Sequence, residues 1–324
     1  MKAVLCKQPG PPSSLVVENI ASPQPGPGQL VVTMQAAGVN FPDVLIIQGK
    51  YQHKPEMPFS PGAEASGIVK AVGPGVTGFS VGDAVAAVMT YGAFAEEIVV
   101  DAARAIKLPA RFDMKVAACF GLTYGTSYHA LKDRARIRPG ETMLVLGAAG
   151  GVGLAAVELG ALMGARVIAA ASSEEKLATC RRFGAAHTIN YAEEDLREAL
   201  RKIVGNDGVD VVYDPVGDKY AEPAVRSLAW GGRFLVVGFA AGEIPKIPLN
   251  LLLLKGASIV GVFWGNFSQR EAAANANNNA TLVRWIASGH LKPLISATYR
   301  LDQVPAALTD MSNRKVQGKV VVVP

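Results

Sequence analysis

A glycine-rich turn between an apolar strand and an alanine-rich helix is the feature that most constrains this chain. The strand is predicted at 142–146, the turn runs from Gly147 to Gly153, and the helix is predicted from Leu154 to Met163. A second apolar run at 166–171 follows at the spacing of a βαβ unit. Glycine lets backbone N–H groups approach a pyrophosphate at a helix N-terminus. The pattern predicts a dinucleotide-binding unit, with a tight turn that binds no ligand as the alternative.

The distribution of strands predicts two domains within the 324 residues. Short valine-rich runs at 15–17, 30–33, 65–72 and 84–88, separated by Pro and Gly, indicate a β-rich, barrel-like domain. From about Met114, helices alternate with strands predicted at 142–146, 166–171, 187–190, 209–213, 233–237 and 258–262. Six such strands describe a doubly wound parallel sheet, so we expect an α/β fold.

The segment after Phe263 has a mixed character. It contains an asparagine run, an amphipathic helix near 279–288, and strand-like runs at 294–299 and 319–323 that resemble the first segment. We therefore expect the chain to return to its first domain. The predicted boundaries are 1–121 for the first domain, 122–263 for the nucleotide domain, and 264–324 for the return.

Composition excludes several classes of protein. No apolar run is long enough to span a bilayer, and Cys6, Cys119 and Cys180 form no close pair, so we expect a cytoplasmic protein without membrane association or disulfides. The net charge is +5, but the Lys and Arg residues are scattered rather than gathered into a stripe. We expect no nucleic-acid partner, and a modest positive excess suits a polyanionic cofactor.

The end of the second strand bears on which nicotinamide cofactor is bound. An NAD-specific unit places an acidic residue about 20 positions beyond the turn, where this chain has Ala169-Ala-Ala-Ser172-Ser173. Hydroxyl groups followed by Lys176 can receive a phosphate, so NADPH is favoured over NADH. Two alternatives stay open. In the first, the serines only start the next helix as caps; in the second, Glu174 and Glu175 keep an NAD interpretation available.

Several ordered motifs resemble a known family along essentially the whole chain. The chain resembles the zinc-independent medium-chain dehydrogenases/reductases, most closely the NADPH:quinone oxidoreductase branch that includes zeta-crystallin. This resemblance implies a GroES-like β-rich catalytic domain joined to a Rossmann domain. The motifs are Ala36-Ala-Gly-Val-Asn40-Phe-Pro-Asp43, Pro61-Gly-Ala-Glu64-Ala-Ser-Gly67, Val81-Gly-Asp83, Gly121-Leu-Thr123-Tyr-Gly-Thr126, the glycine turn, Asp214-Pro-Val-Gly217, Gly231-Gly-Arg-Phe-Leu-Val-Val-Gly238 and Gly318-Lys319-Val.

The resemblance also shows what is missing. Zinc alcohol dehydrogenases place Cys near the position of Asn40 and His at Ala63, and the four histidines lack partners at ligand spacing, so no metal site is expected. Glu64 is expected to be a hydrogen-bonded structural carboxylate. Without a metal to polarise oxygen, an acceptor that is already electron-poor fits best, such as a quinone or a conjugated enone that takes hydride from the nicotinamide C4.

The resemblance assigns roles to individual residues. It places Asn40, Asp43 and Tyr51 in the catalytic pocket, with Tyr51 as the substrate hydrogen-bond donor; a second family tyrosine position is Leu45 here. The alternatives are a turn asparagine, an exposed loop tyrosine, a helix cap for Ser172, a solvated charge for Lys176, a strand-end aromatic for Tyr191 and an edge lysine for Lys319. The cofactor contacts that the resemblance implies are Asn40, Thr123, Gly150, Gly151, Val152, Gly153, Ser172, Lys176, Tyr191, Phe239, Phe263, Trp264 and Lys319.

Three functions follow as hypotheses. The first is NADPH-dependent reduction of a small-molecule quinone. The second is reduction of the C=C bond of enones, alkenals or enoyl-thioesters with the same cofactor, and the third is NADPH binding with little catalysis. The family resemblance also implies a homodimer formed through the strand at 258–263, whose uncovered apolar edge would otherwise invite aggregation.

Overall fold

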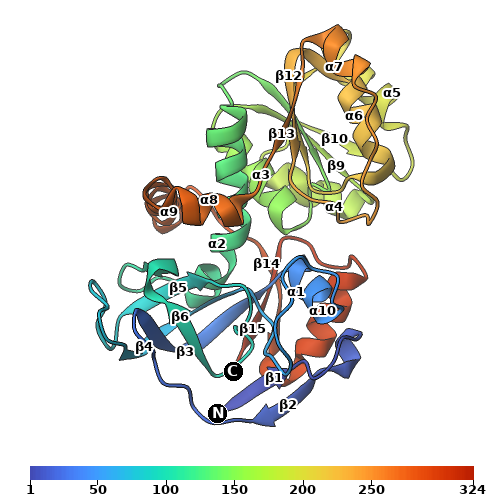
Figure 1. Ribbon diagram of the computed structural model, residues 1–324. Helices are drawn as coiled ribbons and strands as arrows, with labels where there is room; N and C mark the ends of the chain where they lie inside the picture. Colours follow the sequence, from blue (N-terminus) through green and yellow to red (C-terminus); the bar gives the residue numbers. More distant parts are fainter. The chain divides into compact units, whose positions relative to one another are not determined.

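The computed structural model describes residues 1–324 and divides the chain into two compact units. Unit 1 contains Met1–Leu122 and Pro293–Pro324, and unit 2 contains Thr123–Lys292. Each unit is built around its own sheet (Figure 1). The α/β class predicted from the sequence is confirmed.

Unit 1 is built on a seven-stranded sheet of order β14-β15-β3-β4-β5-β7, in which β6 also pairs with β3. Strands β1 and β2 form a separate antiparallel pair. The elements are β1 (Lys2–Leu5), η1 (Pro12–Ser14), β2 (Val16–Asn19), β3 (Gln29–Val39), α1 (Phe41–Ile47), β4 (Glu64–Val72), β5 (Ala84–Val88), β6 (Glu97–Asp101), η2 (Ala102–Arg104), β7 (Ala105–Lys107), the start of α2 (Met114–Tyr128), β14 (Ile295–Arg300), η5 (Leu301–Gln303), α10 (Val304–Ser312) and β15 (Lys319–Val323).

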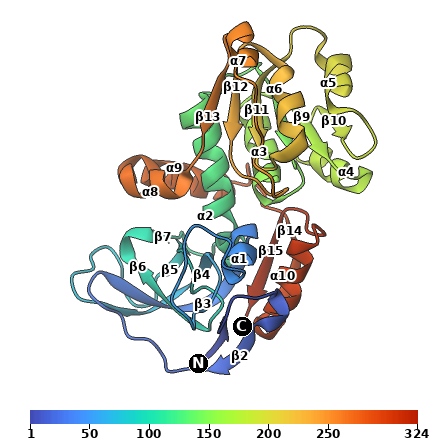
Figure 2. The ribbon, with the colours of Figure 1, turned by 45° about the vertical axis from the view of Figure 1, so that its right-hand side comes forward.

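The long strand β3 organises this unit. From Val32 to Gln35, buried residues alternate with exposed ones, which is the pattern of a strand with one face on the core, whereas residues 30–31 and 36–39 are buried throughout. The C-terminal strand β15 pairs antiparallel with β3, and β14 pairs parallel with β15. Helix α10 packs beside β14 and β15 (Figure 2). The chain therefore completes its first sheet with residues from beyond unit 2.

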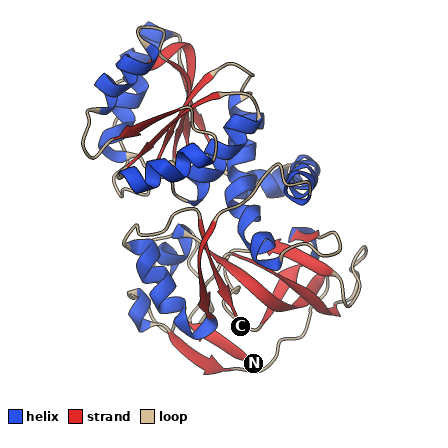
Figure 3. Ribbon diagram, turned by 180° about the vertical axis from the view of Figure 1, so that it is seen from behind, coloured by secondary structure: helices blue, strands red, loops and turns tan.

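Unit 2 is a parallel sheet of order β10-β9-β8-β11-β12-β13 with helices on both faces (Figure 3). This is the strand order of dinucleotide-binding folds. Successive strands are added on one side of β8 as far as β10, and then on its other side from β11 onward. After α2 the elements are η3 (His129–Ala135), β8 (Thr142–Leu146), α3 (Gly151–Leu162), β9 (Arg166–Ala171), α4 (Glu174–Arg182), β10 (His187–Asn190), α5 (Leu196–Val204), β11 (Val209–Asp214), η4 (Asp218–Tyr220), α6 (Ala221–Arg226), β12 (Leu228–Val236), α7 (Asn250–Lys255), β13 (Ser258–Gly261), α8 (Trp264–Arg270) and α9 (Ala272–Ala287).

The boundary predicted at 264 is wrong, because residues 264–292 belong to unit 2 and the return begins at Pro293. Helices α8 and α9 pack against the end of α2 and η3. The Trp285 ring lies edge-on to Tyr128 with centroids 5.4 Å apart, and the Phe267 ring stacks on His129. Helix α9 also includes the asparagine run, where weak helix formers gave little sequence signal. These contacts with Tyr128 and His129 hold α8 and α9 in unit 2.

Candidate active site

The glycine turn brings the start of α3 close to the end of β8. Gly150 is the N-cap, and the N–H groups of Gly151, Val152 and Gly153 have no acceptor within the helix. A Cβ at Gly153 would lie 2.2 Å from the Gly147 carbonyl oxygen, so no other residue fits there. The predicted residues therefore form a helix N-terminus with free donors, which is suited to a pyrophosphate.

The end of β9 presents two donors to solvent. The Lys176 ammonium donates to the Ser172 hydroxyl at 3.3 Å, and Ser172 is exposed. The neighbouring Ser173 is the residue that caps α4, because its hydroxyl accepts the Lys176 backbone N–H at 3.4 Å. The capping alternative thus applies to Ser173, which leaves Ser172 and Lys176 together at the strand end.

Two further residues shape this strand end. Glu174 forms an ion pair with Arg181, so one of the two acidic side chains that kept an NAD interpretation open is engaged elsewhere. The Tyr191 backbone N–H donates to the Ala171 carbonyl at 3.1 Å, which places Tyr191 beside Ser172. Its ring packs against Tyr220 with centroids 4.4 Å apart. Tyr220, which lies after β11 in η4, belongs to no recognisable motif.

The aromatic residues predicted near the nicotinamide occupy the loops after β12 and β13. Trp264 begins α8, and a Cβ at Gly125 of α2 would lie 3.0 Å from its indole ring, so the ring lies against the helix backbone. Thr123 is buried on the same helix, two residues earlier. Phe263 is 55% exposed, and Phe239 is exposed beside Gly217. The structure thus brings Trp264 to the α2 segment that contains Thr123.

Sequence reasoning missed Ser127, which joins α2 to the glycine turn. Its hydroxyl donates to the Val152 carbonyl at 2.9 Å and lies 2.8 Å from the Tyr213 hydroxyl of β11. A serine within a helix forms no recognisable motif, so only the fold could reveal this contact. It helps to fix α2 against the turn that carries the free N–H groups.

Unit 1 contains a buried cluster of Asn40, Asp43, Glu64 and Lys319, called here the Glu64 cluster. The Lys319 ammonium donates to the Glu64 carboxylate and the Asn40 amide oxygen, each at 2.5 Å, and to the Val39 carbonyl at 3.1 Å. The Lys319 and Glu64 side chains are only 3% and 1% exposed. All three donors of the ammonium are therefore used. Lys319 is no solvent-facing edge lysine, and it can reach a ligand directly only by giving up one of these contacts.

Asn40 is also saturated within the Glu64 cluster. Its amide nitrogen donates to Glu64 at 3.0 Å and to the Gly38 carbonyl at 3.3 Å, and its backbone N–H donates to the Asp43 carboxylate at 2.8 Å. Asn40 is the N-cap of α1 and is 4% exposed. The predicted turn role therefore holds for its backbone, while its amide orders the buried charges.

Burial shifts the pKa of two side chains in this region, Asp43 and Tyr51. Burial raises the pKa of Asp43 to about 7, although the Asn40 N–H and the positive charge of Lys319 act in the opposite direction. Burial, and then the negative charge of Asp43, raises the pKa of Tyr51. Tyr51 is half-buried and packs against the core of unit 1, so it is more than an exposed loop tyrosine. It keeps its proton at neutral pH and can donate a hydrogen bond.

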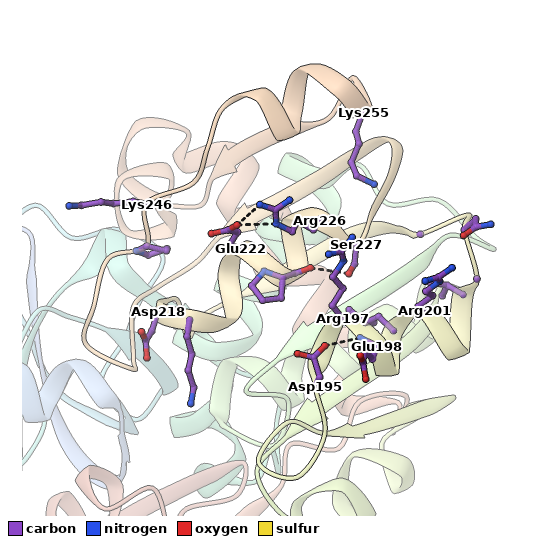
Figure 4. A pocket seen from close by; sticks show the side chains of 18 of the residues that line it. Asp195, Arg197, Glu198, Arg201, Asp218, Glu222, Arg226, Ser227, Lys246 and Lys255 are labelled. Carbon is purple, nitrogen blue, oxygen red and sulfur yellow. Dashed lines mark hydrogen bonds and ion pairs between the residues drawn. The ribbon is translucent and has the colours of Figure 1, made fainter.

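A groove in unit 2 is lined by a different set of residues. It has a volume of about 1200 Å³ and lies between α5 and α6 (Figure 4). Six basic and five acidic side chains line it, and Glu222 pairs with Arg226. None of the predicted site residues is among them. Its nearly balanced charge gives no preference for an anionic ligand, so the candidate site stays at the glycine turn.

Comparison with known proteins defines the class. Residues 26–110 match the alcohol dehydrogenase GroES-like domain, and residues 151–279 match the zinc-binding dehydrogenase domain. A GroES-like unit with a nucleotide-binding parallel sheet is the architecture of the medium-chain dehydrogenases/reductases, as the sequence resemblance implied. None of the helices in the structure has the length and apolar character to cross a membrane.

Relatives narrow the class to one family. The chain is 37% identical to quinone oxidoreductase-like protein 2 of Mus musculus, over 99% of this chain and 91% of the relative. It is 33% identical to a 2-haloacrylate reductase of Burkholderia sp, over 100% and 99%. A crystal structure of Escherichia coli quinone oxidoreductase complexed with NADPH superposes with a TM-score of 0.93, 31% identity and full coverage of both chains. The chain belongs to the quinone oxidoreductase family.

The zinc ion that the domain name implies does not fit the residues of the Glu64 cluster. An amide stands at Asn40, a methyl group at Ala63, and the ammonium of Lys319 already contacts Glu64 and Asn40. A catalytic zinc needs three nitrogen, sulfur or oxygen ligands. No group of three or more His, Cys, Asp or Glu side chains is arranged to hold a metal.

Proposed function

We propose that this chain is an NADPH-dependent oxidoreductase that reduces quinones by hydride transfer from the nicotinamide C4. The observation that carries the cofactor choice is the end of β9, where Ser172 and Lys176 lie together and the acidic residue of NAD-specific folds is missing. The NADPH complex of the Escherichia coli relative supports it.

The residues of unit 2 fit NADPH. The free N–H groups at the start of α3 would bind the pyrophosphate, and Lys176 with Ser172 would hold the 2′-phosphate through charge-assisted hydrogen bonds. Tyr191 would flank that phosphate. Thr123, Phe239, Phe263 and Trp264 would contact the nicotinamide end. Bound NADPH supplies the hydride, while these side chains orient it and exclude water.

The residues of unit 1 would serve the acceptor. Tyr51 would donate a hydrogen bond to the acceptor oxygen as negative charge develops there, because its raised pKa keeps the hydroxyl protonated. Asn40 and Asp43 would shape the pocket. For Lys319 we propose an indirect role, since its contacts fix the Asn40 amide. A quinone needs little further activation because its own conjugation makes it electron-poor.

Reduction of an activated C=C bond is the second candidate. It is favoured by the similarity to the 2-haloacrylate reductase, because a 2-haloacrylate contains a conjugated C=C bond. It requires protonation at carbon in addition to hydride transfer, whereas a quinone is protonated on oxygen.

One panel of assays tests these proposals. Oxidation of NADPH and NADH is followed against quinones, enones and enoyl-thioesters, with and without a chelator. We expect turnover of quinones with NADPH that the chelator leaves unchanged. Faster turnover of enones or thioesters would select the second candidate, and tight NADPH binding without any oxidation would select the non-catalytic hypothesis. Loss of activity on chelation would contradict the metal-free mechanism.

We also propose a homodimer through β13. The strand ends the parallel sheet with an unpaired edge, and Ile259 on it is 38% exposed. On α7, Leu253 and Leu254 are 80% and 71% exposed. Light scattering should give twice the chain mass, and Ile259→Asp should give the monomer; a wild-type monomer would contradict the proposal. The cytoplasmic location stays a prediction from the sequence.

A further inference from the structure

The segment that follows α2 has an unusual backbone that the proposed function does not explain. Residues His129–Ala135 form a π-helical turn, called here the π turn. The Arg136 backbone N–H donates to the Leu131 carbonyl, five residues back, and Arg136 has a left-handed conformation with φ 50°. Turns of this kind are rare and occur frequently at functional sites. The side chains around the π turn therefore call for an explanation.

A partly buried polar cluster, in which His129 and Asn278 are the buried members, connects the π turn to α9. His129 Nδ1 lies 2.9 Å from Asp133 Oδ2, and the Asn278 amide donates to the same oxygen at 2.9 Å. The Lys132 ammonium donates to the Asn278 amide oxygen at 2.5 Å. His129 is 5% exposed and Asn278 is 2% exposed. Buried polar groups are costly unless they are paired, so this set of contacts fixes one arrangement of the π turn and α9.

His129 also contacts α8 through Phe267. The His129 ring stacks on Phe267 with centroids 3.8 Å apart and planes at 18°. Phe267 lies three residues after Trp264 on a helix of seven residues, so both side chains lie on the same side of α8. Trp264 in turn lies against the backbone of α2 at Gly125. Helix α8 is thus attached to α2 at Gly125 and to the π turn at His129.

We propose that His129 is a positioning residue for the nicotinamide end of the cofactor. Together with Asp133 and Asn278, it holds Phe267 and thereby α8, so that Trp264 keeps its place against α2 at Gly125. This inference rests on the proposed function, since it assumes that the dinucleotide is NADPH. It adds no contact between His129 and the ligand, because the imidazole acts only through Phe267 and α8.

The test compares two ligands that share the adenosine half. NADPH contains the nicotinamide, whereas 2′-phospho-ADP-ribose lacks it. In the full chain, His129→Leu removes the stacked ring, and calorimetry should show affinity for NADPH about tenfold weaker with affinity for 2′-phospho-ADP-ribose unchanged. The KM for NADPH should rise more than kcat falls. His129→Phe restores an aromatic ring and should recover part of the NADPH affinity.

Controls separate positioning from general damage. His290→Gln changes an exposed histidine of the same unit and should leave both affinities unchanged. Phe267→Leu removes the ring from the other side of the stack, so it repeats the test if His129→Leu does not fold. Equal weakening of both ligands, or no weakening of NADPH in either variant, would overturn the positioning role. If the wild-type chain bound neither ligand, the assignment of NADPH as the cofactor would be wrong, and the positioning role of His129 would be wrong as a consequence.

Discussion

The Glu64 cluster of unit 1 and the strand ends of unit 2 differ in how their polar groups are paired. In the Glu64 cluster of unit 1, every donor of Lys319 and of the Asn40 amide is paired with an acceptor inside the unit. At the ends of β8 and β9 in unit 2, backbone N–H groups and the Ser172 hydroxyl face outward. Saturated groups hold a structure in place, whereas unsatisfied groups can bind. Substitutions in unit 1 should therefore change stability, and those at the strand ends of unit 2 should change affinity.

The largest effect is expected at Lys319. Lys319→Met leaves the Glu64 carboxylate buried without its counter-ion, which should lower the free energy of unfolding by about 3–5 kcal/mol. Urea denaturation measures it. The matched control is Lys7→Met, which breaks the exposed pair with Glu18 and should cost about 1 kcal/mol or less. Similar losses of unfolding free energy in the two variants would show that Lys319 and Glu64 do not form a buried ion pair.

The next effect concerns the pH dependence of stability. The pKa of Asp43 is about 7 in the folded chain, above its ordinary value of 3.8, so the folded state binds a proton that the unfolded state releases between these values. Stability should fall as pH rises from about 4 to 7 and then level off, by about 4 kcal/mol at most.

Asp43→Asn should remove this contribution, so its stability relative to wild type should rise with pH over that window. Denaturation midpoints at pH 5 and pH 8 give the comparison. The exposed carboxylate of Glu56 provides the control, because Glu56→Gln should track the wild type at both pH values. A difference between Asp43→Asn and wild type that does not change with pH would argue against the buried carboxyl.

A substitution at Gly153 should change both stability and cofactor affinity. Gly153→Ala forces a methyl group to within 2.2 Å of the Gly147 carbonyl oxygen, and the resulting shift should cost about 1–3 kcal/mol of stability. It should also displace the free N–H groups, so NADPH and NADH should both bind more weakly. Calorimetry of both cofactors checks this. An unchanged affinity would mean that the pyrophosphate binds elsewhere.

The smallest effect on the fold is expected at Lys176. Lys176→Ala should weaken NADPH binding about tenfold or more by removing a charge-assisted contact to the 2′-phosphate, while NADH binding and stability stay close to wild type. Lys202→Ala, on the exposed face of α5, controls for net charge. Equal losses for the two cofactors would remove the phosphate assignment and would weaken the contrast between the units.

Much of the fold follows from local patterns. The predicted strands at 142–146, 166–171 and 187–190 coincide with β8, β9 and β10. Strands β8 and β9 could be found because parallel strands buried on both faces form continuous apolar runs. The assignment of 264–292 failed for the opposite reason. Helices α8 and α9 are held by contacts such as Phe267 on His129 and Asn278 on Asp133, which join residues more than 130 positions apart. No local pattern encodes such pairs.

The candidate site divides in the same way. The glycine turn and the pair of Ser172 and Lys176 could be found because their chemistry depends on residues close in sequence. The saturation of Lys319 could not, since Val39, Asn40 and Glu64 reach it only through the pairing of β15 with β3 and of β3 with β4. Ser127 and Tyr220 were missed because neither forms part of a motif.

The pairing of β15 with β3 has a consequence for synthesis on the ribosome. Unit 2 is one continuous stretch of chain and has all its strands once residue 292 has emerged, whereas unit 1 must wait for residues 293–324. During that interval the nascent β3 lacks its neighbour β15, and Glu64 lacks Lys319, which neutralises it. When β15 emerges, it pairs with β3 and completes the sheet of unit 1. The same strand brings Lys319, which neutralises the Glu64 carboxylate.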